Sequence, residues 1–355
     1  MGLKFAVIPW NDAGLQDRIF ITNESKMNVD VRNNAFLDMK CTFEEKGDSF
    51  HTIDIYSTLE EIDFFCFFEL DWKWLDKIIS AGFAHKMVYC NSEPPVVNPR
   101  NCPVGYEFIE RFFPYILTWN NDWIDGITVF KRNIPYTFVE NYGDVNFSER
   151  KLLTCISGNK KSKHPDEMYS ERERVITFLE NKYPNDFDFY GTGWKKSIHP
   201  SYCGRVEKKA ETYHKYKFAI CFENMKNIKG YVTEKILDCL VAGIVPVYAG
   251  AEDIKEYVPE ECFINYWNFP DEESMVNFLM SMEEKEYQKY LDAGKAFIHS
   301  NMVEEFSGQR YAEYIYDVFK NKKNFQVSLC NRLYVKGVLW KQNIIRSLKT
   351  VIKRK

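Results

Sequence analysis

Short apolar runs recur along the first 120 residues and predict the strands of a buried sheet. They occupy residues 4–8, 52–56, 62–68, 86–90 and 115–119. Leu75, Ile78 and Ile79 recur at helical spacing and Gly82 follows, which predicts a helix over residues 75–81 that ends at a glycine cap. Strands that alternate with helices in this way indicate a parallel sheet with crossover helices.

The same rhythm restarts near residue 150 and predicts a second unit of the same class. Strands are expected at residues 151–156, 187–190, 216–222 and 244–248, and helices at residues 169–181 and 233–242. Two such halves predict a two-lobed α/β protein. Its ligands then bind at the carboxyl ends of the strands, where the lobes face each other across a cleft.

Charge is divided unevenly between a body and a tail. Residues 321–355 contain ten Lys and Arg and no acid, so a chain with a net charge of −4 carries −14 over residues 1–320. With 28% charged and 45% hydrophobic residues, the chain is typical of a soluble globular protein. A pI near 6.0 argues against nucleic-acid binding, whereas the basic tail indicates an anionic partner.

A helix over residues 340–355 of this tail places apolar side chains on one face and basic side chains on the other. The apolar face contains Trp340, Ile344, Ile345, Leu348, Val351 and Ile352. Such a helix suits the surface of an anionic bilayer, and we expect it to bind a membrane. The alternative is that it docks on the acidic body of the protein itself.

The remaining sequence signals favour a cytoplasmic protein. Pro9, Asn11 and Asp12 interrupt the apolar start of the chain before an export signal can form. The longest apolar run, residues 240–251, is too short to span a membrane. Ten cysteines without a C-x-x-C pair indicate buried thiols in a reducing compartment. Together with the tail, these features predict a protein bound peripherally to the inner face of the cytoplasmic membrane.

One strand-to-helix connection in the second half carries groups that suit an anion. The strand ends in Glu223 and Asn224, and Thr233 can cap the helix that follows. Free N–H groups at a helix start attract anions, and Lys235 adds a full positive charge in the first turn. The alternative is an ordinary surface lysine beside Glu234, a common first-turn acid.

Three segments of the second half read Cys-Phe-Glu-Asn at 221–224, Tyr-Val-Thr-Glu-Lys at 231–235 and Ala-Gly-Ile-Val-Pro-Val-Tyr-Ala-Gly at 242–250. Together they resemble the donor-binding core of the α-1,3/1,4-fucosyltransferases (glycosyltransferase family 10). The resemblance is dense over residues 217–269, looser over 151–195 and thin before 150.

This resemblance implies an α/β fold in the GT-B arrangement, with two Rossmann-like lobes and a cleft between them. The expected parts are an acceptor-binding lobe over residues 1–148, a GDP-fucose-binding lobe over 149–320 and a basic amphipathic tail over 321–355. The implied reaction is an inverting transfer of L-fucose from GDP-fucose to a hydroxyl of an oligosaccharide or glycolipid.

Carried over position by position, the resemblance also assigns donor contacts. Lys235 contacts the diphosphate, Glu234 the ribose hydroxyls, and Tyr231 and Asn224 complete the GDP-fucose pocket. Fixed cations stabilise the charge that a leaving diphosphate gains in the transition state.

Arg172 matches the family's diphosphate-contacting arginine by its spacing to Leu179. Arg174, two residues away, leaves this register less firmly set than that of Lys235. An exposed arginine on the helix surface is the alternative for Arg172.

Glu93 is the expected catalytic base. It follows a predicted strand, and Pro94 and Pro95 stiffen the chain behind it. An inverting transfer needs one carboxylate to take the proton of the acceptor hydroxyl. The alternative is that Glu93 only binds an acceptor hydroxyl or caps a turn.

No Asp-x-Asp metal clamp is apparent in the sequence, so we predict no obligatory metal, although a divalent ion can stimulate some relatives. The expected linkage is α-1,3 to a GlcNAc or glucose residue of a lipopolysaccharide O-antigen or Lewis-type glycan. Two alternatives stay open: a GT-B transferase that uses another nucleotide sugar, and a non-catalytic sugar-binding or membrane-scaffold protein.

Overall fold

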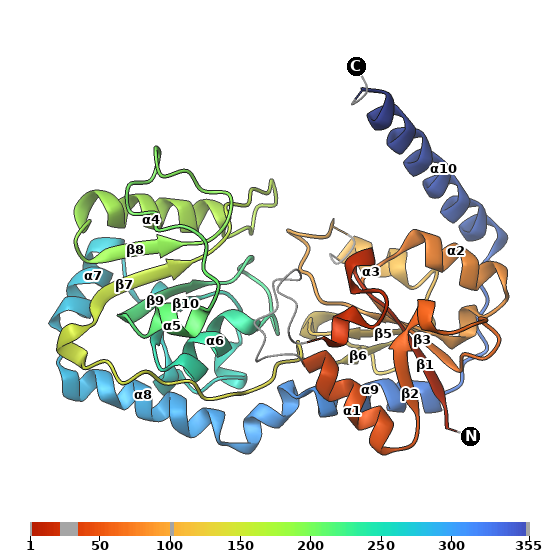
Figure 1. Cartoon of the computed structure of the whole chain (residues 1–355), viewed down its shortest axis with the longest axis horizontal. Coiled ribbons are helices and arrows are strands. Elements are labelled where there is room, and N and C mark those ends of the chain that lie inside the picture. The colour runs from red at the N-terminus through yellow and green to blue at the C-terminus, as the bar shows by residue number, and fades with distance from the viewer. Residues whose placement is uncertain (1, 22–34, 100–102, 353–355) are drawn as a thin grey trace.

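The computed structural model describes residues 2–21, 35–99 and 103–352 as two α/β lobes followed by a long C-terminal helix (Figure 1). The first lobe contains a six-stranded sheet in the order β2-β1-β3-β4-β5-β6, and every neighbouring pair is parallel. The strands are β1 (Lys4–Ile8), β2 (Ser49–Thr52), β3 (Phe64–Phe68), β4 (Met87–Cys90), β5 (Tyr115–Thr118) and β6 (Val129–Lys131).

The second lobe repeats this plan with a five-stranded parallel sheet in the order β11-β10-β9-β7-β8. The strands are β7 (Lys151–Ile156), β8 (Phe187–Tyr190), β9 (Tyr216–Phe222), β10 (Val245–Ala249) and β11 (Ile264–Asn265). The two-lobed α/β fold predicted from the alternating apolar runs is confirmed.

Helices cover both faces of each sheet, as buried parallel strands require. In the first lobe, α1 (Ala35–Glu45) lies on one face, and α2 (Trp72–Ser80) and α3 (Pro103–Ile109) lie on the other. In the second lobe, α4 (Tyr169–Lys182) and α7 (Glu272–Ser281) lie opposite α5 (Lys209–Tyr213), α6 (Glu234–Ala242) and α8 (Glu284–Ile298).

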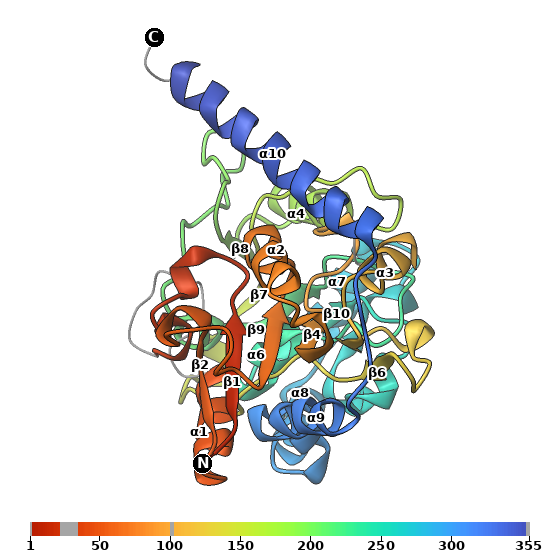
Figure 2. The ribbon, with the colours of Figure 1, turned by 90° about the vertical axis from the view of Figure 1, so that its right-hand side faces the viewer.

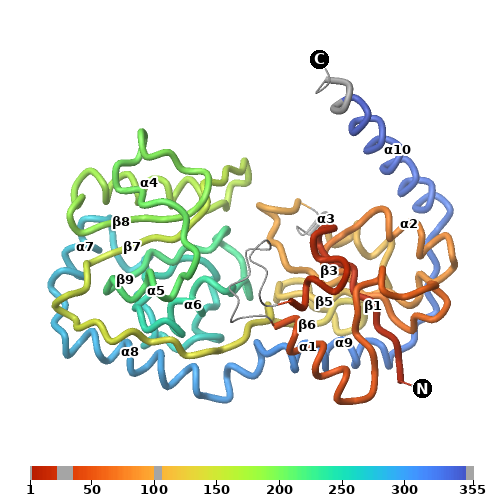
Figure 3. Tube along the Cα trace, viewed as in Figure 1, coloured from red at the N-terminus to blue at the C-terminus, as the bar shows by residue number. Residues whose placement is uncertain are grey.

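Helix α9 (Gly308–Lys320) packs on the first lobe although it follows the second lobe in the chain (Figure 3). Tyr311 and Ile315 are buried in the same apolar cluster as Phe5 and Phe43. The second lobe was expected to extend to residue 320, whereas residues 308–320 pack on the first lobe. There α9 and α1 together cover one face of the first sheet. The chain therefore passes between the lobes twice, first between β6 and β7 and again between α8 and α9.

Most predicted elements of the two sheets are present, and one is wrong. The strand expected at residues 52–56 ends at Thr52 and continues as a 3₁₀ turn over Ile53–Ile55. Asp54 lies in that turn and accepts the backbone N–H of Gln16, so the apolar alternation here belongs to a turn rather than to a strand. The helix predicted over residues 75–81 begins earlier, at Trp72, because Asp71 caps α2 by accepting the N–H of Trp74.

The tail forms helix α10 (Leu329–Ile352), which leaves the body of the molecule (Figure 2). Its first half packs on α2, where Val335 is buried and the Tyr334 ring lies 6.1 Å from that of Trp72. Residues 341–348 are all exposed, so these eight residues do not dock on the acidic body. Across the described residues, none of the helices combines the length and hydrophobicity needed to cross a bilayer.

Candidate functional site

The carboxyl end of β9 and the start of α6 meet at a fully buried carboxylate, Glu223. It accepts hydrogen bonds from the backbone N–H of Thr233 (2.9 Å), from the Thr233 hydroxyl (2.8 Å) and from Nζ of Lys235 (3.1 Å). Thr233 in turn caps α6 by accepting the N–H of Lys235. We call Arg172, Glu223, Thr233, Glu234 and Lys235 the β9–α6 cluster.

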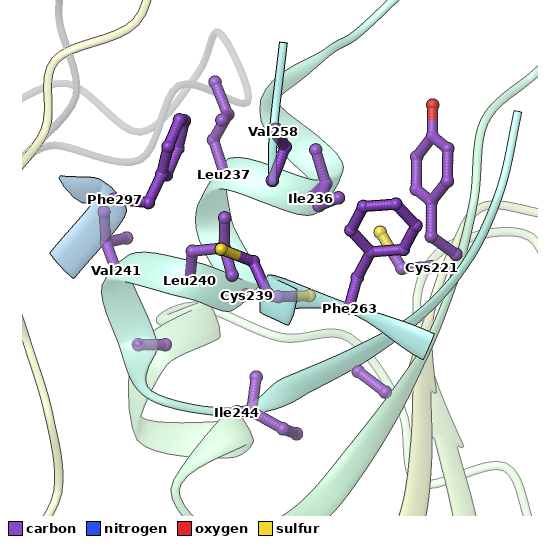
Figure 4. Packing of buried hydrophobic residues seen from close by; sticks show 14 of the residues in the cluster. Cys221, Ile236, Leu237, Cys239, Leu240, Val241, Ile244, Val258, Phe263 and Phe297 are labelled. Atoms are coloured by element: carbon purple, nitrogen blue, oxygen red, sulfur yellow. The ribbon is translucent and has the colours of Figure 1, made fainter. Parts of the chain in front are cut away.

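The position of this cluster depends on how firmly α6 is held. Seven consecutive residues of α6, from Ile236 to Ala242, are buried, and Figure 4 shows Ile236, Leu237 and Leu240 packed among side chains such as Phe263. The helix ends at Gly243 with φ +68°, the left-handed conformation that glycine adopts readily. A helix seated in this way holds its first turn, and with it Lys235, in one place relative to the sheet.

Lys235 is a cation held between two carboxylates. Burial acts to lower the pKa of Lys235, but Glu223 and Glu234 raise it above its ordinary value, so the ammonium group stays charged. Oε1 of Glu234 lies 3.6 Å from Nζ of Lys235, and half of the Glu234 side chain is exposed. Its dense surroundings oppose ionisation, yet the charges of Lys235 and Lys209 lower the pKa of Glu234 to about 2. Both groups are ionised at neutral pH.

The structure separates the two arginines of α4. Arg172 is buried, and its Nη2 donates to the carbonyl oxygens of Phe222 (2.6 Å) and Glu223 (3.0 Å) at the end of β9. Arg174 is 53% exposed and pairs with Glu171 and Glu272 on the outer surface. Arg172 therefore belongs to the β9–α6 cluster and Arg174 does not, as the predicted register requires.

Tyr231 and Asn224 lie together, but the ring of Tyr231 is not open to a ligand. Tyr231 is 2% exposed, and its ring packs against that of Trp119 in the first lobe at 4.7 Å. The Asn224 amide donates to the Tyr231 hydroxyl at 3.3 Å. The ring of Tyr231 therefore packs between the lobes and offers no open face on which a ligand could stack. A donor contact from Tyr231 has to come from its hydroxyl.

Glu93 approaches the β9–α6 cluster from the other lobe. It follows β4 in a turn and is partly buried. Burial raises the pKa of Glu93, Glu69 raises it further, and Lys160 and Lys235 of the second lobe lower it. The carbonyl oxygen of Ser92, the residue before Glu93, accepts from the Trp119 indole at 3.1 Å, and the Trp119 ring packs on that of Tyr231 in the second lobe at 4.7 Å. The turn of Glu93 therefore lies beside the loop that leads into α6.

The lobes are joined next to this pair of sites. Gly230 has φ +78°, and a Cβ atom there would lie 2.1 Å from the carbonyl oxygen of Trp119, so the close approach requires glycine. Asp253 of the second lobe accepts hydrogen bonds from the Asn121 amide of the first lobe and from the N–H of Gly230, each at 2.7 Å. The loop that leads into α6 is therefore fixed against both lobes.

Two carboxylates of this region were not among the predicted site residues. Glu223 directly follows β9 and Glu69 directly follows β3, and both accept backbone N–H groups of the site. The available signal was their place immediately after a buried apolar run, where parallel strands present their ends.

Two cavities of the second lobe are lined by residues outside the β9–α6 cluster. Two cavities of about 310 and 600 Å³ lie in the second lobe, and neither is lined by Lys235, Arg172 or Glu93. In residues 2–21, 35–99 and 103–352, no three His, Cys, Asp or Glu side chains gather as a metal site. The absence of an obligatory metal stays a prediction.

Known proteins resemble this chain in sequence and in fold. The family model "Glycosyltransferase family 10 (fucosyltransferase) C-term" matches residues 148–330. Alpha-(1,3)-fucosyltransferase FucT of Helicobacter pylori is 28% identical over 257 residues, which are 66% of this chain and 51% of that protein. This chain spans about half the length of the curated relatives it matches.

Two solved structures share the fold at low sequence identity. A crystal structure of α1,3-fucosyltransferase with GDP-fucose matches with a TM-score of 0.51 at 14% identity, over 92% of each chain. Anabaena HepE in complex with UDP-glucose matches with a TM-score of 0.55 at 11% identity, over 90% of this chain and 100% of that one. At these identities the likeness shows the fold alone, which is the expected GT-B arrangement.

Proposed function

The chain belongs to glycosyltransferase family 10, the fucosyltransferases, and we propose that it transfers L-fucose from GDP-fucose to a glycan hydroxyl with inversion at the sugar carbon. The observation that carries this proposal is that Trp119 contacts both the turn of Glu93 in the first lobe and Tyr231, in the loop that leads into the cationic β9–α6 cluster of the second lobe. A base and a charge-stabilising group on opposite sides of a cleft are what a direct displacement needs.

On the donor side, the β9–α6 cluster receives the diphosphate. The bond between the fucose C1 and the phosphate oxygen breaks, and its electron pair leaves with GDP. Lys235, the start of α6 and Arg172 stabilise the negative charge that builds up on the departing diphosphate. Glu223 fixes Lys235 beforehand, so little reorganisation is needed when that charge develops. The Glu234 carboxylate is available to accept the ribose hydroxyls.

On the acceptor side, Glu93 removes the proton of the attacking hydroxyl. The acceptor oxygen forms the new bond to C1 from the face opposite the departing phosphate, and the proton ends on the Glu93 carboxylate. The raised pKa of Glu93 makes it a better proton acceptor in its ionised form. We further propose α-1,3 linkage to a GlcNAc or glucose residue of an O-antigen or Lewis-type glycan.

The donor is tested directly by mass spectrometry of transfer reactions with a panel of nucleotide sugars. Purified protein is incubated with GDP-fucose, GDP-mannose or UDP-glucose and a panel of oligosaccharide acceptors. We expect a mass gain of one fucose with GDP-fucose only. Transfer from another donor supports the second reading, a related GT-B enzyme, and titration with GDP that gives no heat supports a non-catalytic protein.

We also propose that the tail binds the anionic inner face of the cytoplasmic membrane. The exposure of Trp340, Ile344, Ile345 and Leu348 on α10, beside basic residues, supports it. Sedimentation with phosphatidylglycerol vesicles tests this: we expect the native protein to bind and the double variant Ile344→Asp/Leu348→Asp to stay in solution. Ile198→Asp, at an exposed second-lobe position, is the control that should bind like the native protein.

A further inference from the structure

The turn that presents Glu93 is held at each of its backbone polar groups. The N–H groups of Ser92 and Glu93 both donate to Oε1 of Glu69, at 2.9 and 3.0 Å. The carbonyl oxygen of Ser92 accepts from the Trp119 indole at 3.1 Å, and that of Glu93 accepts from the Asn91 amide at 3.2 Å. The turn therefore has little freedom to change the direction in which Glu93 points.

Glu69 is itself fixed in an unusual conformation. Its second carboxylate oxygen accepts from the Tyr89 hydroxyl and from the Asn98 amide, both at 2.9 Å. Its backbone has φ +71°, a left-handed conformation that costs a residue other than glycine on the order of 1 kcal/mol or more. This strained backbone conformation occurs at the residue whose carboxylate binds the turn at Ser92 and Glu93.

The opposite side of the turn is held by a cation. Arg132 is completely buried, and its Nη2 donates to the Ser92 hydroxyl at 3.1 Å. Its Nε has no hydrogen-bond partner among the described residues. Arg132 thus holds the Ser92 side chain, while the Glu69 carboxylate holds the backbone N–H groups of both Ser92 and Glu93.

We propose that Glu69 is the positioning residue for the catalytic base: its carboxylate fixes the backbone of Glu93, and its negative charge helps Glu93 take up the acceptor proton. The inference rests on the proposed function, in which Glu93 is that base. Glu69 acts only through Glu93 and is not itself expected to contact substrate.

Several other ionisable groups face Glu93. They are Lys160, Glu234 and Lys235, together with the hydroxyls of Tyr169 and Tyr231. Both tyrosines have pKa values raised by burial, so they stay neutral, and the two lysines act against Glu69. Of the charges around Glu93, Glu69 is the strongest that raises its pKa.

The first test is the pH profile of kcat/KM for Glu69→Gln. Glutamine keeps an oxygen that can accept the two N–H groups but loses the charge. Because a neighbouring anion is removed, the pKa of Glu93 falls, and we expect the acidic limb to move down by roughly half to one pH unit. Glu69→Ala also loses the acceptor, so kcat should drop about 10- to 100-fold with little change in the KM for GDP-fucose.

Glu61 offers a matched control at the other end of β3. Its carboxylate likewise accepts two consecutive N–H groups, those of Ser57 (2.6 Å) and Thr58 (3.1 Å). Glu61→Gln should leave the pH profile unchanged. An acidic limb that stays in place in Glu69→Gln, or that moves equally in Glu61→Gln, overturns the proposal.

A second measurement separates this inference from the proposed function. In protein labelled with ¹³C at glutamate carboxyls, the Glu93 signal is identified by its loss in Glu93→Gln and is titrated by NMR without turnover. We expect Glu69→Gln to lower the pKa of Glu93; an unchanged pKa refutes the role of Glu69 even if fucose transfer is established. Near-normal turnover of Glu93→Ala refutes the base assignment, whatever the NMR titration gives.

Discussion

The two lobes place a glutamate at equivalent points and use it differently. Glu69 follows β3 and Glu223 follows β9, and each accepts backbone N–H groups of a neighbouring loop. Glu223 is completely buried and binds the cation Lys235, whereas Glu69 is partly exposed and none of the ion pairs of the described chain includes it. Glu223 thus orients the cation Lys235, whereas Glu69 orients the backbone of the acid Glu93.

This difference matches the two halves of the proposed reaction. The second lobe must stabilise charge on a departing diphosphate, so its carboxylate orients a lysine. The first lobe must accept a proton, so its carboxylate raises the proton affinity of Glu93. A glutamate directly after a strand thus orients a cation, Lys235, in the second lobe and the base Glu93 in the first. The outcome differs because different residues lie within reach of the two carboxylates.

The largest expected change in activity comes from a substitution in the first lobe, at Glu93. Glu93→Ala removes the base, and kcat should fall about 10³-fold, within the range for general-base catalysis, while GDP binding is retained. Steady-state kinetics and calorimetric titration with GDP measure the two quantities. A fall in GDP affinity with kcat preserved would reverse the roles given to the two lobes.

Lys235→Ala probes the second-lobe side. It removes the cation of the β9–α6 cluster, and the dissociation constant for GDP should rise roughly 100-fold, as expected for a lost charge-assisted contact in a partly buried site. Lys208→Ala is the control, since Lys208 is an exposed lysine of the same lobe that pairs only with Glu211 among the described residues. Equal GDP affinity in both variants contradicts the assignment.

Glu223→Gln tests how strongly the two carboxylates differ in stabilising the fold. Without the Glu223 charge, Lys235 keeps only Glu234 as a counter-charge, so the free energy of unfolding should fall by about 1–3 kcal/mol. Glu69→Gln should cost less, because no cation loses its partner. Thermal unfolding followed by circular dichroism compares them, and a larger loss in Glu69→Gln would remove the distinction.

Arg172→Ala and Arg174→Ala form the smallest and most closely matched comparison. Arg172 lies at the end of β9, and its loss should weaken GDP binding about tenfold. Arg174 pairs with Glu171 of the same helix and with Glu272 of α7, and its loss should leave GDP binding unchanged. If Arg174→Ala weakens GDP binding more, the register drawn from Leu179 is wrong.

Local sequence patterns predicted much of the fold because buried parallel strands have a strong apolar signature. Strands β1, β7, β8 and β9 have the bounds that their apolar runs predict. The pattern failed at residues 53–55, where alternation arises from a turn held by a distant N–H group. The apolar pattern also did not predict that α9 packs on the first lobe. That packing depends on the face of the first sheet that α9 shares with α1.

The candidate site divides in the same manner. Lys235, Glu234 and Arg172 gather where the motif spacing predicts, because they lie on one strand-to-helix connection and the helix beside it. Nothing in the sequence indicated that the ring of Tyr231, expected in the donor pocket, is covered by Trp119, which lies more than 100 residues earlier in the chain. Glu69 was missed because its partners at residues 92, 93 and 98 are brought to it by sheet pairing alone.

By itself, the sequence determined two parallel sheets, a basic tail and a set of charged side chains at strand ends, since apolar periodicity and capping act over a few residues. Only the tertiary structure decided which arginine turns inward, which lobe holds α9 and which carboxylate grips the turn of Glu93. Those outcomes depend on contacts between segments far apart in the chain, and no local pattern specifies which of them will meet.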